Sequence, residues 1–244
     1  MVAAFGKFTQ VRWRDVKWIV QPGESPLFGS ERGCDAFEQR LLRFDGASDE
    51  HSNEADDEVL YVLSGKARAT IGGEPADLSP GTAAFVACGS SWRIDDAEDL
   101  ELLSVLVRDP VPTNGSTHGV VAVDQVETGE ATAGRQFRLL ATPEIGCRSV
   151  TQFVGYIPVV RAPDHFHKYD EVVYILEGEG KLHIAGETAR LRAGTCVHLP
   201  SGLVHCLENV GPGEMRVLGV FRPAGSPAEA YYPDGSAAVV PAAG

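Results

Sequence analysis

The 244-residue chain has few positive charges, no long apolar run and no signal-like start. Its 21 Lys and Arg residues face 34 Asp and Glu residues, giving a formal net charge of −13, which disfavours nucleic acid and anionic membranes as partners. No apolar run approaches the roughly 18 residues that a membrane-spanning helix needs. The first ten residues lack the basic-then-apolar pattern of a secretion signal. We therefore expect a cytoplasmic protein without a nucleic-acid or membrane partner.

Paired cysteines are also absent. The five cysteines are widely spread, with no Cys-x-x-Cys pair: Cys34, Cys88, Cys147, Cys196 and Cys206. This odd number at wide spacing predicts neither a zinc site nor a disulfide framework. The chain is instead rich in glycine and proline, with 27 and 15 residues. That composition favours many short strands joined by tight turns over a helical bundle.

The chain contains an internal repeat displaced by 113 positions. The segment that starts at Glu58 (EVLYVLSG) matches the segment that starts at Glu171 (EVVYILEG). The same displacement relates Gly81 to Gly194. A constant register over more than thirty residues indicates two homologous units of about 100 residues each.

Each unit is predicted to consist of strands. In the second unit, the β-branched and aromatic run 172–176 is closed by Gly178, and an alternating run follows at 181–184. Turn signals recur every 8–12 residues without helical periodicity, which predicts an all-β sandwich or barrel of antiparallel strands. The expected organisation is an N-terminal strand or arm (1–34), a first barrel (35–108), a linker (109–124), a second barrel (125–222) and a C-terminal tail (223–244).

The second unit carries a constellation typical of a transition-metal site. His165 and His167 are two residues apart, so on a strand both side chains point to the same face. A short turn then leads to Glu171, and His205 follows a Pro-x-Gly turn that can return a separate strand. Three neutral imidazoles and one carboxylate suit a borderline divalent ion, and an octahedral ion would keep two positions open.

On these residues the second unit resembles a cupin, and the whole chain resembles a bicupin. Gly178 and Asn209 close the two cupin motifs, whereas Val159 stands where the first motif usually has a glycine. The resemblance implies two tandem jelly-roll β-barrels, that is, double-stranded β-helices. It also implies one divalent transition metal ion, with Fe, Mn or Ni favoured and Zn or Cu as alternatives. The implied ligands lie in the lumen of the second barrel: His165, His167, Glu171 and His205.

The first unit lacks a complete ligand set. His51 and Glu58 match the first histidine and the glutamate, but Asn53 and Trp92 replace the other two histidines. A Trp indole has no lone pair to offer a metal ion, and its size suits it to filling the lumen. We expect a metal-free first barrel; the alternative is an emptied barrel that binds an organic ligand against Trp92.

Three residues near the expected metal site are candidate catalytic residues. His198, like His183, lies in a strand of the second barrel and would carry protons if it faced the lumen; otherwise it is a core or outward histidine. Gln152 and Tyr156 share one face of the strand 148–156, so they contact the substrate if that face is inward and lie outside if it is not.

Two further positions have expected roles. Cys206 is adjacent to a ligand, but strand alternation points its thiol away from the metal, as a packed apolar group. The segment 231–235 is expected either to lie across a barrel mouth or to form a loosely ordered tail.

The resemblance implies three classes of function. The first, preferred on what cupins most often do, is an oxidoreductase of dioxygenase type acting on a small oxygenated substrate that coordinates the metal, similar to quercetin-type and gentisate-type dioxygenases or oxalate-degrading enzymes. The second is a redox-neutral isomerase, lyase or hydrolase, as in ureidoglycine aminohydrolases, whose ligand arrangement differs. The third is a non-catalytic binding protein. Open coordination positions favour an enzyme over a structural ion. A homodimer formed through sheet edges is also expected.

Overall fold

The computed structural model describes residues 19–20, 27–113 and 115–238. The remaining parts of the expected N-terminal arm and C-terminal tail lie outside the described residues. The strands are β1 (Ile19–Val20), β2 (Phe37–Phe44), β3 (His51–Ser52), β4 (Asp57–Ile71), β5 (Glu74–Leu78), β6 (Thr82–Val86), β7 (Ser91–Val107), β8 (His118–Ala122), β9 (Gly129–Glu130), β10 (Gln136–Ala141), β11 (Thr151–Ile157), β12 (Asp170–Glu177), β13 (Glu179–Ile184), β14 (Glu187–Arg192), β15 (Cys196–Leu199), β16 (His205–Asn209) and β17 (Met215–Arg222).

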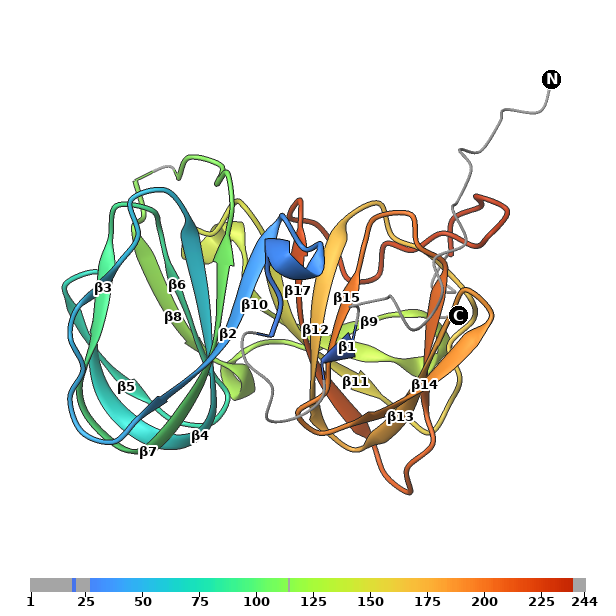
Figure 1. The fold of residues 1–244 in the computed structure, drawn as a ribbon, viewed down its shortest axis with the longest axis horizontal. Coiled ribbons are helices and arrows are strands. Elements are labelled where there is room, and N and C mark those ends of the chain that lie inside the picture. The colour runs from blue at the N-terminus through green and yellow to red at the C-terminus, as the bar shows by residue number, and fades with distance from the viewer. Residues whose placement is uncertain (1–18, 21–26, 114, 239–244) are drawn as a thin grey trace.

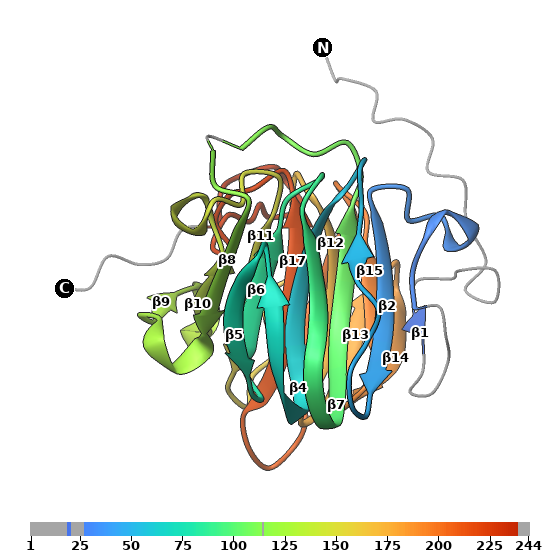
Figure 2. The ribbon, with the colours of Figure 1, turned by 90° about the vertical axis from the view of Figure 1, so that its left-hand side faces the viewer.

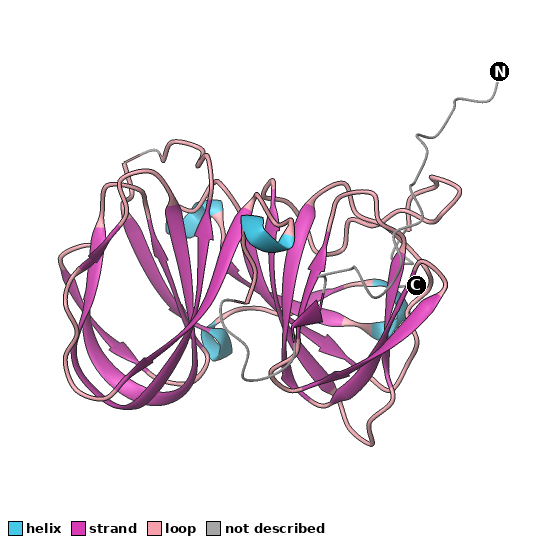
Figure 3. Cartoon of the chain, in the orientation of Figure 1, coloured by secondary structure: helices cyan, strands magenta, loops and turns pink. Residues whose placement is uncertain are grey.

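Helical structure within the described residues is confined to short 3₁₀ turns (Figure 3). They are η2 (Ser30–Arg32), η3 (Val123–Gln125), η4 (Thr132–Gly134) and η5 (Pro143–Ile145). In this part of the chain, no helix has the length and apolar character needed to cross a membrane.

The strands form two β-barrels that lie side by side (Figure 1). The first barrel has the sheet β2-β7-β4-β6-β8, to which β3 adds along β7 and β5 adds along β4. The second barrel combines the sheet β1-β15-β12-β17-β11-β10-β9 with the sheet β14-β13-β16. The pairings within both barrels are antiparallel. The predicted all-β fold of two tandem jelly-roll barrels is confirmed.

Two connecting segments contribute to the sheets. Strand β8 lies inside the expected linker 109–124, yet it pairs with β6 of the first barrel. Strand β1 belongs to the N-terminal arm, and it pairs with β15 of the second barrel. The composition of the segment 109–118 predicts irregular backbone, but it does not indicate with which strand β8 pairs.

Strand alternation decides which side chains each barrel encloses. On β12, Glu171, Val173 and Ile175 face the lumen of the second barrel, whereas Val172 and Tyr174 face the first barrel. Successive side chains of a strand point to opposite faces, so one strand serves two different cores. Each lumen has its own apolar cluster, and a third cluster lies between the barrels.

The cluster between the barrels joins the outer faces of the two large sheets. It includes Val59, Phe85 and Leu103 from the first barrel and Val154 and Val220 from the second, all buried. Figure 2 shows the first-barrel sheet in front of the second barrel, with the strands of both running roughly along the same direction. The hydrophobic effect at this shared face holds the two repeats together as one folded unit.

Candidate metal centre

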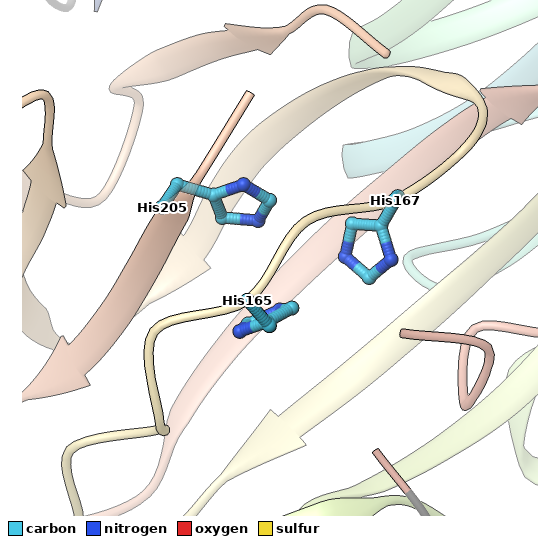
Figure 4. A group of neighbouring side chains, drawn as sticks. All are labelled: His165, His167 and His205. Carbon is cyan, nitrogen blue, oxygen red and sulfur yellow. The ribbon is translucent and has the colours of Figure 1, made fainter. Parts of the chain in front are cut away.

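Three histidines converge in the lumen of the second barrel (Figure 4). His165, His167 and His205 are all buried, and one ring nitrogen from each lies within 4.8 Å of the others. The backbones of His165 and His205 exchange two hydrogen bonds, of 3.0 and 2.8 Å between N and O, which bring the two distant segments together. The predicted convergence of these three side chains is confirmed.

A backbone carbonyl sets the tautomer of each ring. The contacts are His165 Nδ1 to Pro163 O at 2.7 Å, His167 Nδ1 to Glu229 O at 2.8 Å and His205 Nδ1 to Leu203 O at 2.8 Å. A carbonyl oxygen only accepts hydrogen bonds, so each Nδ1 donates and carries the proton. Each Nε2 therefore keeps its lone pair for a metal ion, as in histidine-ligated sites generally.

Burial keeps these imidazoles neutral. It lowers the pKa of His165 to about 4 and the pKa of His167 to about 3, with the charge of neighbouring His165 adding to the second effect. The pKa of His205 is also well below its ordinary value, chiefly because of burial. Metal ions bind the unprotonated ring, so at neutral pH the three nitrogens need lose no proton to act as ligands.

Glu171 lines the same cavity but lies outside the 4.8 Å cluster of histidine nitrogens. Burial raises the pKa of its carboxyl group to about 8, against the opposing influence of Arg135. Within the described chain, its carboxylate has no hydrogen bond or ion pair. Gly219 on β17 leaves it room, because a Cβ there would lie 2.9 Å from Glu171 Oε1. The donor set fits a divalent transition metal, with Glu171 as predicted fourth ligand.

The rest of the cavity is mostly apolar. Its volume is about 60 Å³, and its apolar lining includes Phe137, Phe153, Ile157, Val173, Leu199, Leu207, Val217 and Pro227. A space of this size accepts an ion and a small coordinating group. Apolar walls also lower the local dielectric, which strengthens electrostatic interactions at the site.

Two lining residues that the sequence interpretation missed are Tyr169 and Arg135. The Tyr169 ring stacks between His167 and Phe221, with centroid distances of 4.5 and 4.0 Å. Burial and the charge of Glu171 hold the pKa of Tyr169 far above its ordinary value, so it stays a neutral phenol. Its place between the motif ligands was a usable signal, whereas nothing in the sequence around Arg135 marks that residue.

The C-terminal segment crosses beside the histidines. Tyr231 pairs with Phe166 through two backbone hydrogen bonds of 2.9 and 3.0 Å, and their rings stack at 5.6 Å. The carbonyl of Glu229 accepts the hydrogen bond from His167, and Pro227 lines the cavity. The alternative in which this segment lies across the barrel is therefore the correct one, and it also orients a predicted metal ligand.

Gln152 and Tyr156 do not contact the cavity, which corrects their assignment as catalytic residues. On β11 the cavity is lined by Phe153, Gly155 and Ile157, so the alternate side chains point toward the first barrel. Tyr156 packs against the cluster between the barrels, and Gln152 is fully buried.

His198 also faces away from the histidine cluster and does not line the cavity, so the alternative in which it faces the lumen is wrong. It alternates with Val197 and Leu199, which belong to the lumen cluster, and its ring lies 5.8 Å from that of Phe28. His183 is on the outer surface, where Nε2 lies 2.7 Å from a Glu208 carboxylate oxygen. The sequences of β11 and β15 did not fix which face is inward, because nearly every side chain on both faces is buried.

The Cys206 side chain is directed as expected. Its thiol donates a hydrogen bond to Ala162 O at 2.9 Å and takes no part in the histidine cluster.

The first barrel has a filled lumen in the equivalent place. His51 pairs with Trp92 as His165 pairs with His205, and their rings stack at 4.1 Å with 9° between the planes. The Trp92 indole is 2% exposed and donates a hydrogen bond to Glu58 Oε2 at 2.7 Å. Ser104 donates to the other Glu58 oxygen. The expectation that Trp92 fills the lumen is confirmed.

The side chain of Asn53 also has a structural role. Its Oδ1 accepts hydrogen bonds from the backbone N–H groups of Ala55 and Asp56, each at 3.0 Å, and so shapes the loop before β4. Two of the four ligand positions in the first barrel thus hold residues with structural roles.

The Cupin domain family matches residues 42–106 and 153–221, more than half of the chain. This chain belongs to the cupin family. The cupin is 33% identical over 103 residues to "Polyketide synthase CurC" of Streptomyces cyaneus, covering 41% of this chain and 66% of that protein. It is 30% identical over 76 residues to an uncharacterized protein of Aquifex aeolicus, covering 31% and 61% of the two chains. The matches thus span less than two thirds of either relative.

Solved structures share the bicupin architecture. The cupin superposes on the "Putative Glyoxylate Induced Protein" from Pseudomonas aeruginosa with a TM-score of 0.66 and 16% identity, covering 83% of this chain and 78% of the other. For YlbA of E. coli the TM-score is 0.67 at 16% identity, with 80% of each chain covered. For oxalate decarboxylase of Bacillus subtilis it is 0.66 at 16% identity, with coverage of 81% and 72%. Likeness at this identity shows the fold alone.

Proposed function

We propose that this cupin is a metal-dependent enzyme whose C-terminal barrel acts on a small oxygenated substrate that coordinates the ion. The observation that carries the proposal is the set of three buried imidazoles, each with Nδ1 hydrogen-bonded to a carbonyl and Nε2 free. When bound, a divalent ion such as Fe, Mn or Ni supplies Lewis acidity and open coordination positions for a substrate oxygen or dioxygen.

The surrounding residues support this role. Tyr169 and the Glu229 carbonyl hold the His167 ring in one orientation from two sides. Orientation by such outer contacts raises metal affinity and fixes the ligand geometry. Phe153 and the other apolar side chains exclude bulk water from the space beside the ligands.

A dioxygenase-type oxidation is the reaction we favour. The Streptomyces relative is named as a polyketide synthase. Polyketides carry several oxygen atoms, which are suitable donors to a metal ion at this site. A redox-neutral reaction is the second candidate, because a bound divalent ion can polarise a substrate carbonyl without a change of oxidation state. Neither name assigns a substrate to this chain.

An open coordination position separates an enzyme site from a structural ion. Anaerobic protein loaded with Fe(II) and then exposed to nitric oxide should give the half-integer-spin EPR signal of a ferrous nitrosyl. We expect this signal in the wild type and in Trp92→Phe, and its loss in His205→Ala. Bound iron that takes up no nitric oxide would be fully coordinated by the protein and would overturn the proposal.

Oxygen dependence then distinguishes the two reaction classes. Oxalate, gentisate and quercetin are suitable first probes, because each presents oxygen donors that chelate a metal. Oxygen uptake measured with an electrode indicates the dioxygenase class, whereas conversion under argon indicates a lyase or hydrolase.

A further inference from the structure

Arg135 brings a positive charge to the rim of the metal cavity. It lies where the β9–β10 hairpin returns through η4, at the start of β10, and it lines the cavity. His165, His167 and His205 line the same cavity, so the guanidinium and the three rings share one small space. The β9–β10 hairpin at the edge of the seven-stranded sheet thus brings a cation to the cavity.

The contacts of Arg135 leave part of its guanidinium free. Nε donates to the Thr132 carbonyl at 2.9 Å, and Nη2 donates to Thr132 Oγ1 at 2.6 Å. These two bonds orient the planar group without neutralising it. Among the described residues, no carboxylate lies within the 4.0 Å of an ion pair with Arg135, and Nη1 has no hydrogen-bond partner. One edge of the guanidinium remains available to a ligand.

The charge balance of the cavity favours an anion. A divalent ion, Arg135 and an ionised Glu171 would together carry a net charge of +2 among neutral imidazoles and apolar walls. Positive charge in such surroundings is costly unless an anion compensates it. Arg is also suited to carboxylates and related oxyanions, because its donors form a planar fork.

We propose that Arg135 anchors an anionic oxygen group of the substrate, such as a carboxylate or an enolate, beside the metal. This inference rests on the proposed function and narrows its substrate to small oxygenated anions. The cavity volume of about 60 Å³ admits only the charged, metal-coordinating end of the substrate. The apolar remainder of the substrate lies against Phe137 and Pro227, which line the same cavity.

A purely structural role for Arg135 is the competing explanation, because its bonds to Thr132 also stabilise the hairpin. The two explanations differ in one measurable respect. A hairpin brace affects neutral and anionic ligands alike, whereas an anion anchor affects only the anionic one.

The test uses salicylate and salicylamide, which offer similar oxygen donors and differ in charge. Calorimetric titration of Mn(II)-loaded protein should show that wild type binds salicylate more tightly than salicylamide. In Arg135→Gln we expect salicylate affinity to fall by about tenfold or more, the range of a charge-assisted hydrogen bond, with salicylamide affinity unchanged. Arg135→Lys should fall between the two, because a lysine keeps the charge but not the fork.

Arg138→Gln is the matched control. This arginine is three residues further along, but it lies over the Tyr156 ring at 5.8 Å and donates to Val123 O, away from the cavity. Its removal should leave the salicylate preference unchanged. If Arg135→Gln lowers the affinity for salicylate and salicylamide equally, or lowers neither, the inference is overturned, while the proposal of a metal-loaded enzyme site remains.

Metal content separates failure of the inference from failure of the proposed function. If wild-type protein takes up no metal, the proposed function fails, and the same titrations on metal-free protein still decide whether Arg135 selects the anion. Thermal melting of each variant shows whether the hairpin and barrel remain folded.

Discussion

The two barrels give equivalent glutamates different hydrogen-bonding surroundings. Glu58 in the first barrel accepts hydrogen bonds from Trp92 and Ser104, whereas Glu171 in the second has no such partner within the described chain. The register pairs Leu60 with Ser104 and Val173 with Gly219, so a glycine stands where the first barrel has its serine. The carboxylate is used for packing in one repeat and is left available in the other.

This difference shows that a glutamate at the same position of the fold can be satisfied by protein donors in one barrel and left without them in the other. An indole replaces an imidazole in the first barrel, fills the lumen and bonds the remaining glutamate. Trp92 and Ser104 satisfy the buried carboxylate of Glu58 without an ion. The second barrel lacks these partners and keeps three free imidazole nitrogens.

The largest expected effect is loss of the metal. His165→Ala or His205→Ala should reduce the metal content from about one ion per chain to less than about a tenth, because each change removes one of three clustered ligands. Elemental analysis of purified protein measures this. Trp92→Phe is the control and should keep its metal. Unchanged metal in either histidine variant would contradict the ligand assignment.

The next effect concerns stability of the first barrel. Trp92→Ala should lower the free energy of unfolding by about 3–5 kcal/mol, because it leaves a cavity in the lumen. It also removes the hydrogen bond to Glu58. Trp92→Phe keeps most of the ring volume and should cost less, about 1–3 kcal/mol for the one Glu58 oxygen that loses its donor. Urea denaturation checks both; equal stability of Trp92→Ala and wild type would mean that the indole does not support the lumen.

A smaller effect is expected when the C-terminal segment is removed. Deleting residues 226–244 eliminates the Glu229 carbonyl that orients His167, and metal affinity should fall by about 10–100-fold. Glu229→Ala keeps the carbonyl and should change affinity by less than about threefold. Competition with a chelator measures both. If the deletion binds metal as tightly as the full chain, the carbonyl does not contribute to the site.

The smallest expected effect is the release of a proton when the metal binds. Glu171 has a pKa of about 8, so at pH 7 its carboxyl is mostly protonated in metal-free protein, while the three imidazoles are neutral. Binding of Mn(II) should therefore release about one proton at pH 7 and progressively fewer as the pH rises above 8. Calorimetry in buffers of different ionisation enthalpy measures the release. Glu171→Gln should abolish it and Glu58→Gln should not; release that persists in Glu171→Gln would show that the proton comes from another group.

The sequence by itself determined the repeat, the all-β fold and the replacement of two ligand positions in the first unit. These features follow from residue type and spacing: His165 and His167 must share a face wherever their segment lies, and Trp92 cannot ligate a metal. The tertiary structure alone decided which face of each strand looks inward. Gln152, Tyr156 and His198 point away from the cavity. Alternation along the sequence gave no sign of this direction, because both faces of their strands are buried. Arg135 and the Glu229 carbonyl reach the site from a hairpin and a tail, through folding of distant segments that leaves no local pattern in the chain.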